Sequence, residues 1–245
     1  MRLPNGDFDE KEVPLTAEDL LDPQFGDHMV QGGTHVLLVH DLFVQLLRRY
    51  RSQDDVLVCS DMKMHWGVPG LPEPAPDIAV VRGVRDKTGH RNSFDVVLEG
   101  IRPRFVLEVV SPLYPEQRRN DREKKVAIYQ KLGIEEYFIV DPSTADARYR
   151  LDLIGYRLDH RGLYRPIQPD AQGRLLSETT GLWFSISESG QQVLLVDAMT
   201  GERLLTSFEE ESARQAEEAR RRTAEAELAS LREELARWKS GLGSR

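Results

Sequence analysis

Two acidic residues stand where acids are costly to bury. Glu108 lies inside the apolar run 105–110 (FVLEVV), and Asp77 opens a second apolar run, 77–81, directly after Pro76. An ionised carboxylate in such a run is strongly unfavourable unless it is paired or bound to a metal. If the two runs are neighbouring strands, their carboxylates come within reach of one divalent ion. Two hard oxygen donors without a thiolate suit Mg²⁺ or Mn²⁺ rather than Zn²⁺.

A cation that completes such a site is available on the helix predicted over residues 120–132. Lys125 and Tyr129 are four residues apart, so they share one face of this helix, which also carries Asp121. A lysine facing Glu108 can orient or deprotonate a water, or neutralise charge that builds on a phosphate. The alternative is a structural salt bridge to Glu108 beside a solvated lysine pair, and spacing alone leaves both interpretations open.

The elements that must position these residues follow from hydrophobic periodicity. Strands are expected over residues 55–64, 77–81, 105–110 and 136–140, with helices from Thr16 to before Pro23, over 35–51 and over 120–132. Residues 148–205 are polar and contain glycines at intervals that are typical of turns, a pattern that predicts two or three exposed hairpin strands. The expected fold class is α/β, with a mixed central sheet flanked by helices and followed by a β-rich extension.

Composition narrows the class of protein. The chain has 245 residues and one cysteine, Cys59, which excludes a disulfide framework and a zinc site of several thiolates. The N-terminal residues have no apolar core typical of a signal peptide, and no run approaches the ~20 apolar residues of a membrane span. A cytoplasmic protein without a membrane partner is therefore expected. The net charge of −8 argues against non-specific coating of nucleic acid, but not against a nuclease.

The last part of the chain differs in kind. Residues 207–245 are rich in Glu and Arg, and Ala224, Leu228, Leu231, Leu235 and Trp238 step by four and three, the spacing of a coiled-coil seam. We expect one globular domain over residues 1–206 and a helical tail over 207–245. The tail is either a lone solvated helix or the contact of a homodimer.

The ordered motifs Ala75-Pro76-Asp77, 107–112 (LEVVSP) and Asp121…Lys125…Tyr129…Gly133, followed by 136–142 (EYFIVDP), are together fairly specific. On them the chain resembles the Uma-type putative restriction endonuclease family, formerly a domain of unknown function, in the PD-(D/E)xK nuclease superfamily. The resemblance extends over about residues 15–206 and implies a restriction-endonuclease-like fold.

The resemblance implies a role for each matching residue. Asp77 and Glu108 match the metal ligands, and the carbonyl of Val109 is a natural further ligand for Mg²⁺, with Mn²⁺ as its substitute. The superfamily's usual motif lysine is replaced by Val110 here. In this family the lysine comes from the next helix, at the position of Lys125. The implied catalytic residues are therefore Asp77, Glu108 and Lys125, supported by Asp121 and Tyr129.

The N-terminal part of the motif departs from the family pattern. Relatives commonly carry a Glu a few residues before the histidine that matches His35, whereas Gln31 stands at that position here. An amide keeps an oxygen donor but loses the charge, so metal affinity should fall. Three functions stay open: a metal-dependent endonuclease acting on DNA, a non-catalytic DNA-binding or regulatory module that retains the nuclease fold, and a protein whose coiled-coil tail is the working part on a globular scaffold.

Local positive charge flanks the predicted carboxylates, although the chain as a whole is acidic. Such charge is what an acidic nuclease uses to attract a phosphate backbone, and a solvated surface is the alternative. The residues expected to contact DNA are Arg82, Arg118, Arg119, Arg122 and Lys124.

Overall fold

The computed structural model describes residues 16, 21–22, 33–89, 91–111, 118–143 and 150–242. The chain divides into two compact units, residues 1–204 and 205–245. The first unit is a mixed α/β structure with a central mixed sheet and additional strands, and the second carries a long helix. The expected fold class is therefore confirmed. The helix expected between Thr16 and Pro23 lies largely outside the described residues.

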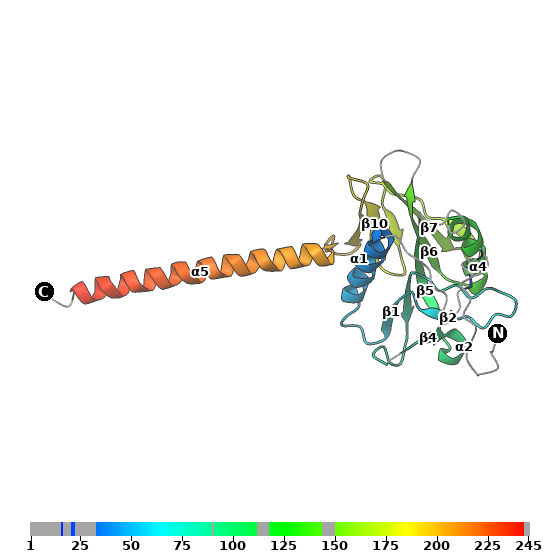
Figure 1. Ribbon diagram of the computed structural model, residues 1–245, viewed down its shortest axis with the longest axis horizontal. Helices are drawn as coiled ribbons and strands as arrows, with labels where there is room; N and C mark the ends of the chain where they lie inside the picture. The colour runs from blue at the N-terminus through cyan, green and yellow to red at the C-terminus, as the bar shows by residue number, and fades with distance from the viewer. Residues whose placement is uncertain are drawn as a thin grey trace, which may run out of the picture. The chain divides into compact units, whose positions relative to one another are not determined.

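A six-stranded mixed sheet forms the centre of the first unit (Figure 1). The central strands β5 and β6 run parallel, and every other neighbouring pair is antiparallel. Both central strands contain an apolar run, 105–107 in β5 and 137–140 in β6, as expected for strands that are covered on two faces. In spatial order the strands are β1 (Val56–Ser60), β3 (Ile78–Arg82), β5 (Pro103–Val109), β6 (Glu136–Ser143), β7 (Arg150–Leu158) and β8 (Tyr164–Pro166).

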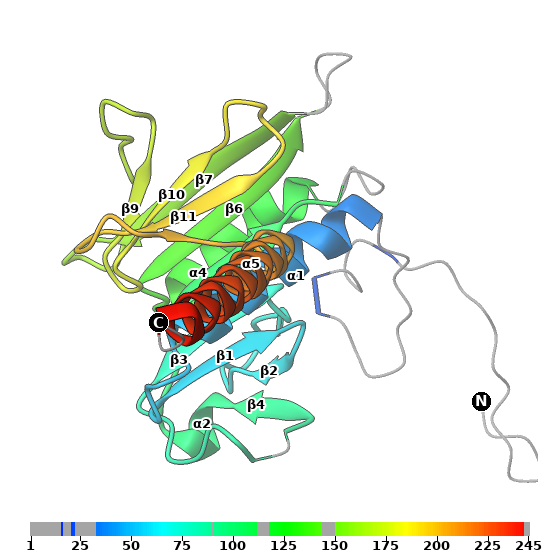
Figure 2. The ribbon, with the colours of Figure 1, turned by 90° about the vertical axis from the view of Figure 1, so that its left-hand side faces the viewer.

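One face of this sheet packs against α1 (Gly33–Arg49) and a second sheet. Helix α1 contacts β1, β5 and β11, and Figure 2 shows the second sheet beside β6 and β7. The rings of Phe105, Phe138 and Phe184 form the centre of this core, with centroids 4.8–5.6 Å apart. The second sheet consists of β9 (Leu175–Ser177), β10 (Leu182–Ile186), β11 (Val193–Asp197) and β12 (Arg203–Leu204).

The opposite face carries the π-helical turn η1 (Asn120–Lys124) and the helix α4 (Lys125–Leu132) that continues it. Tyr129 and Leu132 of α4 belong to the core on this face, and the Tyr129 ring meets Trp66 edge to face at 6.1 Å. A small parallel pair of strands and one helical turn complete this side of the unit: β2 (Lys63–His65), β4 (Ser93–Asp95) and α2 (Val96–Glu99).

The structure corrects three expectations about the elements. The strand expected over residues 55–64 is broken at Asp61, whose φ of +49° turns the chain, so β1 and β2 belong to different sheets. The segment 148–205 forms six strands rather than two or three, and two of these join the central sheet. The first turn of the predicted helix 120–132 is a π-helix. Periodicity did not indicate the short elements β4 and α2.

Helix α5 (Ser207–Leu242) begins with a capping box. The Thr206 hydroxyl accepts a hydrogen bond from the Glu209 amide at 3.3 Å, and the Glu209 carboxylate accepts one from the Thr206 amide at 2.9 Å. No helix in the described part of the chain is long and apolar enough to cross a membrane.

The single cysteine should act as a reporter of unfolding. Cys59 is 2% exposed, and burial raises the pKa of its thiol to about 12. Because the thiolate is the reactive form, we expect no labelling by a thiol reagent at pH 8 while the protein is folded. In denaturant the thiol should react at once and stoichiometrically. Rapid labelling of the folded protein would contradict the buried position of β1.

Candidate active site

The strand register brings Asp77 and Glu108 together. Strands β3 and β5 are antiparallel, and Ile78 lies opposite Leu107, so one step further along Asp77 lies opposite Glu108. Side chains alternate along a strand, and those of Ile78 and Leu107 enter the core beneath α1. Asp77 and Glu108 therefore point to the other face, towards α4. Directly opposite residues have Cβ atoms about 4.5–5.5 Å apart, within the span that one ion bridges.

Backbone and side-chain contacts fix the Asp77 carboxylate. Its Oδ2 accepts a hydrogen bond of 2.6 Å from the Val109 amide, which ties the start of β3 to the end of β5. Its Oδ1 lies 3.6 Å from Nε2 of His35, which is 2% exposed near the start of α1. Burial lowers the pKa of His35, but the carboxylates of Asp77, Asp121 and Asp61 outweigh it and raise that pKa above its ordinary value.

The turn η1 delivers a buried ammonium to the same place. The amide of Lys125 bonds to the carbonyl of Asn120, the five-residue step of a π-helix, which is often found at functional sites. Lys125 is 3% exposed, and its Nζ lies 3.0 Å from Glu108 Oε1 and 2.8 Å from Asp121 Oδ1. The Tyr129 hydroxyl donates to the same Glu108 oxygen at 2.7 Å. Four side chains named from the sequence thus meet in one buried cluster.

Acidic groups outnumber basic groups in this cluster. Burial raises the pKa of Glu108 to about 8, with Asp77 and Asp121 adding to the shift while Lys125 and Tyr129 oppose it. Burial likewise raises the pKa of Asp121 to about 6 against the opposing charge of Lys125. The pKa of Lys125 is also raised, because the surrounding carboxylates outweigh its own desolvation. A further cation would relieve this imbalance.

Asp61 is a member of this site that sequence reasoning missed. Its amide donates to the carbonyl of Asp77 at 3.2 Å, and partial desolvation together with the Asp77 charge raises the pKa of its carboxyl. A non-glycine residue with positive φ is uncommon and marks a constrained turn. An aspartate directly after a β-favouring run was the available signal, but the expected strand ran through it.

The donor chemistry fits a hard divalent ion. Mg²⁺ is commonly held by one or two protein carboxylates together with water and substrate phosphate, which Asp77, Glu108 and the Val109 backbone match. Among the described residues, Asp121 Oδ2 and both ring nitrogens of His35 are buried without a hydrogen-bond partner. Within the same residues no three His, Cys, Asp or Glu side chains are grouped as metal ligands. Gln31 lies outside the described residues.

Three of the four arginines expected to contact DNA are held by contacts within the protein. Arg118 and Arg122 are both paired with the buried carboxylate of Asp141, so they anchor η1 to β6. Arg82 is bonded to Gln53 at 3.2 Å, at the end of β3 far from Asp77, and the structure does not bring it to the cluster.

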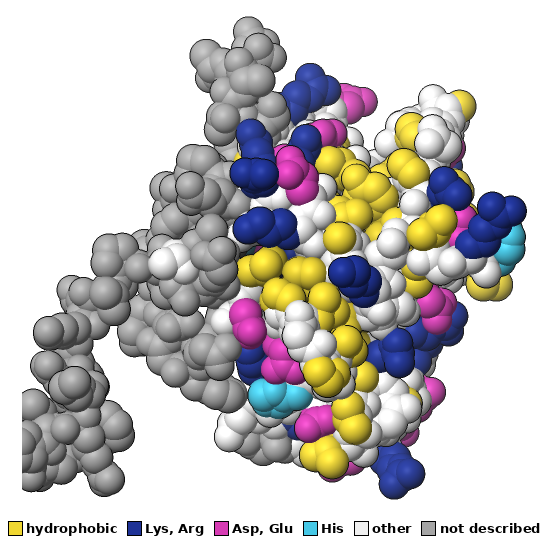
Figure 3. All heavy atoms as spheres, turned by 90° about the vertical axis from the view of Figure 1, so that its right-hand side faces the viewer, with side chains coloured by type: hydrophobic (Ala, Val, Ile, Leu, Met, Phe, Trp, Pro, Cys, Tyr) yellow, Lys and Arg dark blue, Asp and Glu magenta, His cyan; other side chains and the backbone are white. Residues whose placement is uncertain are grey.

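The remaining two basic residues lie on the same segment. Arg119 is exposed and pairs with Glu123, and Lys124 is half-buried directly before Lys125. On the face seen in Figure 3, Lys and Arg side chains lie among acidic and hydrophobic ones rather than in one continuous patch.

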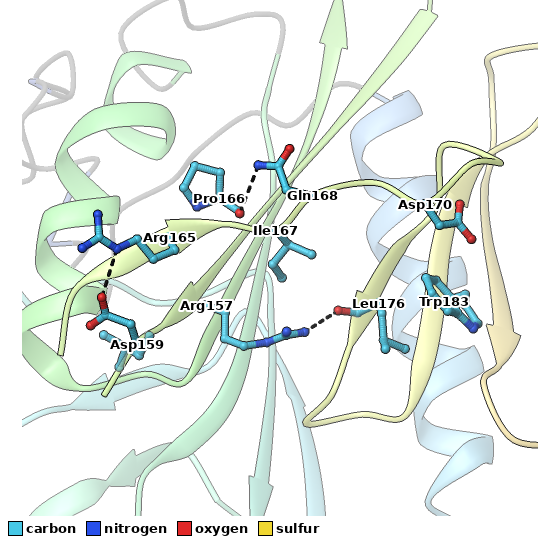
Figure 4. Close-up of a pocket in the computed structure, with 10 residues that line it drawn as sticks. Arg157, Asp159, Arg165, Pro166, Ile167, Gln168, Asp170, Leu176 and Trp183 are labelled. Atoms are coloured by element: carbon cyan, nitrogen blue, oxygen red, sulfur yellow. Dashed lines mark hydrogen bonds and ion pairs between the residues drawn. The ribbon is translucent and has the colours of Figure 1, made fainter. Parts of the chain in front are cut away.

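A pocket of about 430 Å³ lies apart from these carboxylates, where β7 and β8 face β9 and β10 (Figure 4). Arg157 points across it and donates to the carbonyl of Leu176, while also pairing with Glu136 and Glu178. No residue of the buried cluster lines the pocket. Arg157 pairs with Glu136 at the start of β6, opposite Phe105, whereas Glu108 lies opposite Ile139 of the same strand. The pocket is therefore separate from the buried cluster and is not the candidate active site.

The mixed sheet, with buried acids where β3 and β5 meet and a helix-borne lysine facing them, makes the first unit an α/β protein with a carboxylate-rich site. The chain belongs to the Uma2 family, described as "putative restriction endonuclease", whose family model matches residues 24–188. The predicted family is thereby confirmed. No curated protein matches the chain.

A solved structure with similarity to the chain is that of a putative nuclease belonging to DUF820 from Anabaena variabilis. It is 17% identical, the match covers 68% of this chain and 91% of that chain, and the TM-score is 0.44.

Proposed function

We propose that the chain is a Mg²⁺-dependent endonuclease that hydrolyses DNA phosphodiester bonds. The observation that carries the proposal is the buried ammonium of Lys125 between Glu108 and Asp121, with Asp77 directly across the sheet from Glu108. A purely structural ion pair needs one acid for one base, whereas this cluster has acids in excess. Membership of a family described as a putative restriction endonuclease gives the reaction class.

Each residue of the cluster has a proposed role. Asp77 and Glu108, with the carbonyl of Val109, would hold the divalent ion, which supplies an activated water and charge neutralisation at the phosphate. Lys125 would orient that water or stabilise the negative charge that develops during attack. Tyr129 holds the Glu108 carboxylate in place through its hydrogen bond, and Asp121 does the same for the ammonium.

Two of the predicted basic residues suit a contact with the DNA backbone. Arg119 and Lys124 lie on the segment that delivers Lys125, so a phosphate held there is close to the reacting centre. Arg118 and Arg122 are proposed instead to hold this segment in place through Asp141.

The direct test is plasmid nicking. The wild type should convert supercoiled DNA with Mg²⁺ or Mn²⁺ and should fail with EDTA. Asp77→Asn keeps an oxygen that accepts the Val109 hydrogen bond but loses the charge, so we expect cleavage to fall by roughly 100- to 1,000-fold with little loss of stability. The matched control Asp170→Asn changes a half-buried aspartate in a hairpin turn outside the buried cluster and should leave cleavage unchanged.

Two results would contradict the proposal. Equal cleavage by the wild type and Asp77→Asn would assign the activity to a contaminant. Calorimetry that detects no Mn²⁺ binding to the wild type would favour the non-catalytic module, since the site would then lack the ion that its chemistry requires.

A further inference from the structure

Helix α5 carries a stripe of exposed leucines. Leu228, Leu231 and Leu235 are 48%, 65% and 53% exposed, and Ala224 continues the same stripe upstream. Their spacing of four and three residues places them on one seam, at alternating d and a positions of a heptad repeat. The rest of α5 is strongly charged, so the leucines do not belong to a generally apolar surface. A narrow seam of this kind fits one partner helix.

We propose that this partner is α5 of a second copy of the chain, aligned parallel and in register from Ala224 onward. In a parallel pair, each g position faces the e position of the following heptad on the other helix. With leucines at a and d, Arg220 and Glu227 occupy g positions, and Glu225 and Arg232 occupy e positions. Arg220 then faces Glu225 of the second copy, and Glu227 faces its Arg232. Both pairs have opposite charges.

The antiparallel arrangement is disfavoured by the same charges. Placing Leu231 opposite Leu235 packs these two leucines and brings Glu225 next to Lys239, but it also brings Arg232 next to Arg232 and Glu234 next to Glu234 of the second copy. Like charges at these flanking positions oppose pairing. The parallel pair has only opposite charges at these flanking positions, so charge favours the parallel orientation.

The upstream half of α5 limits where the pairing begins. The a and d positions there are Arg214, Glu217 and Arg221, which would stack like on like in a parallel seam. The two arginines instead pair within their own helix, Arg214 with Glu218 at 3.8 Å and Arg221 with Glu225 at 3.4 Å. The paired region is thus confined to the leucine-bearing end.

Parallel pairing has a consequence for the proposed nuclease. The first unit of each chain ends at residue 204, just before α5 begins, so both units are attached at the same end of the paired helices. One dimer would then carry two candidate active sites. This consequence rests on the proposed function, whereas the pairing does not.

Disulfide trapping tests orientation in the full-length chain. Ala224→Cys should give a cross-linked dimer on mild oxidation, because in-register d positions bring the new thiols within disulfide distance. An antiparallel alignment would put them about 27 Å apart along the axis. The control Ala226→Cys lies on the opposite face and should not cross-link. The native Cys59 is buried and does not interfere.

Sedimentation tests the pairing itself. The wild type should sediment at about twice the 28.0 kDa chain mass. Leu231→Glu should weaken the dimer at least ~100-fold, whereas Ala226→Glu, which adds the same charge on the other face, should not. A monomeric wild type, or a dimer that survives Leu231→Glu, would overturn the proposal. So would a Leu231-dependent dimer that fails to cross-link through Ala224→Cys. None of these outcomes depends on nuclease activity.

Discussion

A Lys125→Met chain should be less stable than the wild type by roughly 3–5 kcal/mol at pH 8 without divalent cations. Methionine replaces the buried side chain with one of similar length but without charge. Glu108 and Asp121 then lose the ammonium that lies 3.0 and 2.8 Å from their oxygens and offsets their desolvation. Cleavage should fall by roughly 100- to 1,000-fold, because the same ammonium is proposed to stabilise the charge on the phosphate. Urea unfolding in EDTA measures the first effect, and plasmid nicking measures the second.

The effects of pH and of Mn²⁺ distinguish a loss of charge in Lys125→Met from a loss of packing. At pH 5 both acids take up protons, so the deficit of Lys125→Met should shrink, and added Mn²⁺ at pH 8 should restore part of the stability. The neighbouring control Lys124→Met should change stability by no more than about 0.5 kcal/mol, since that side chain is outside the buried cluster. A deficit that is equal at both pH values and insensitive to Mn²⁺ would mean that Lys125 acts through packing.

The parts of the site that the sequence predicted are those that depend on strand periodicity. Apolar runs located β3 and β5, and an acid inside such a run has few explanations, so Asp77 and Glu108 were found before any geometry. Lys125 and Tyr129 followed from their separation of four residues along a helix. These signals are local or have a fixed period, and the cross-strand contact then follows from the antiparallel register.

The parts that were missed depend on tertiary contacts. The inward direction of Lys125 is associated with a π-helical turn, and no residue pattern in 120–124 distinguishes that turn from an α-helix. Asp61 required a break in a run that reads as one strand. Arg118 and Arg122 resembled a DNA-binding cluster, but their partner Asp141 lies about twenty residues further on and becomes a neighbour only when β6 is in place. Composition reports charge, not which charges are already paired.

The lysine of this site comes from a helix rather than from β5. The sheet supplies two carboxylates on one face, and the cation must approach from the element that covers that face, which is α4. Asp121 holds the ammonium from one side while Glu108 receives it from the other. The ammonium therefore reaches the carboxylates from the covering helix and not from the sheet.

Glu108→Gln should make the metal-free protein more stable at alkaline pH while removing cleavage. Burial raises the pKa of the Glu108 carboxyl from 4.5 to about 8. The folded state thus binds this proton more tightly than the unfolded state does, and the resulting stability is present below about pH 4.5 and lost as the pH rises towards 8. Glutamine keeps the shape and stays neutral. In EDTA the variant should exceed the wild type by roughly 2–4 kcal/mol at pH 8.5 and match it near pH 5.

The matched control is Glu123→Gln, which removes an exposed carboxylate from η1 with the same change of atoms. Its free energy of unfolding should stay within about 0.5 kcal/mol of the wild type at both pH values. Mn²⁺ should reverse the order at pH 8.5, stabilising the wild type more than Glu108→Gln, because only the wild type offers both carboxylates to the ion. If Glu108→Gln is instead less stable than the wild type at pH 8.5 in EDTA, the carboxylate is ionised and well compensated by Lys125. The site then needs no further cation.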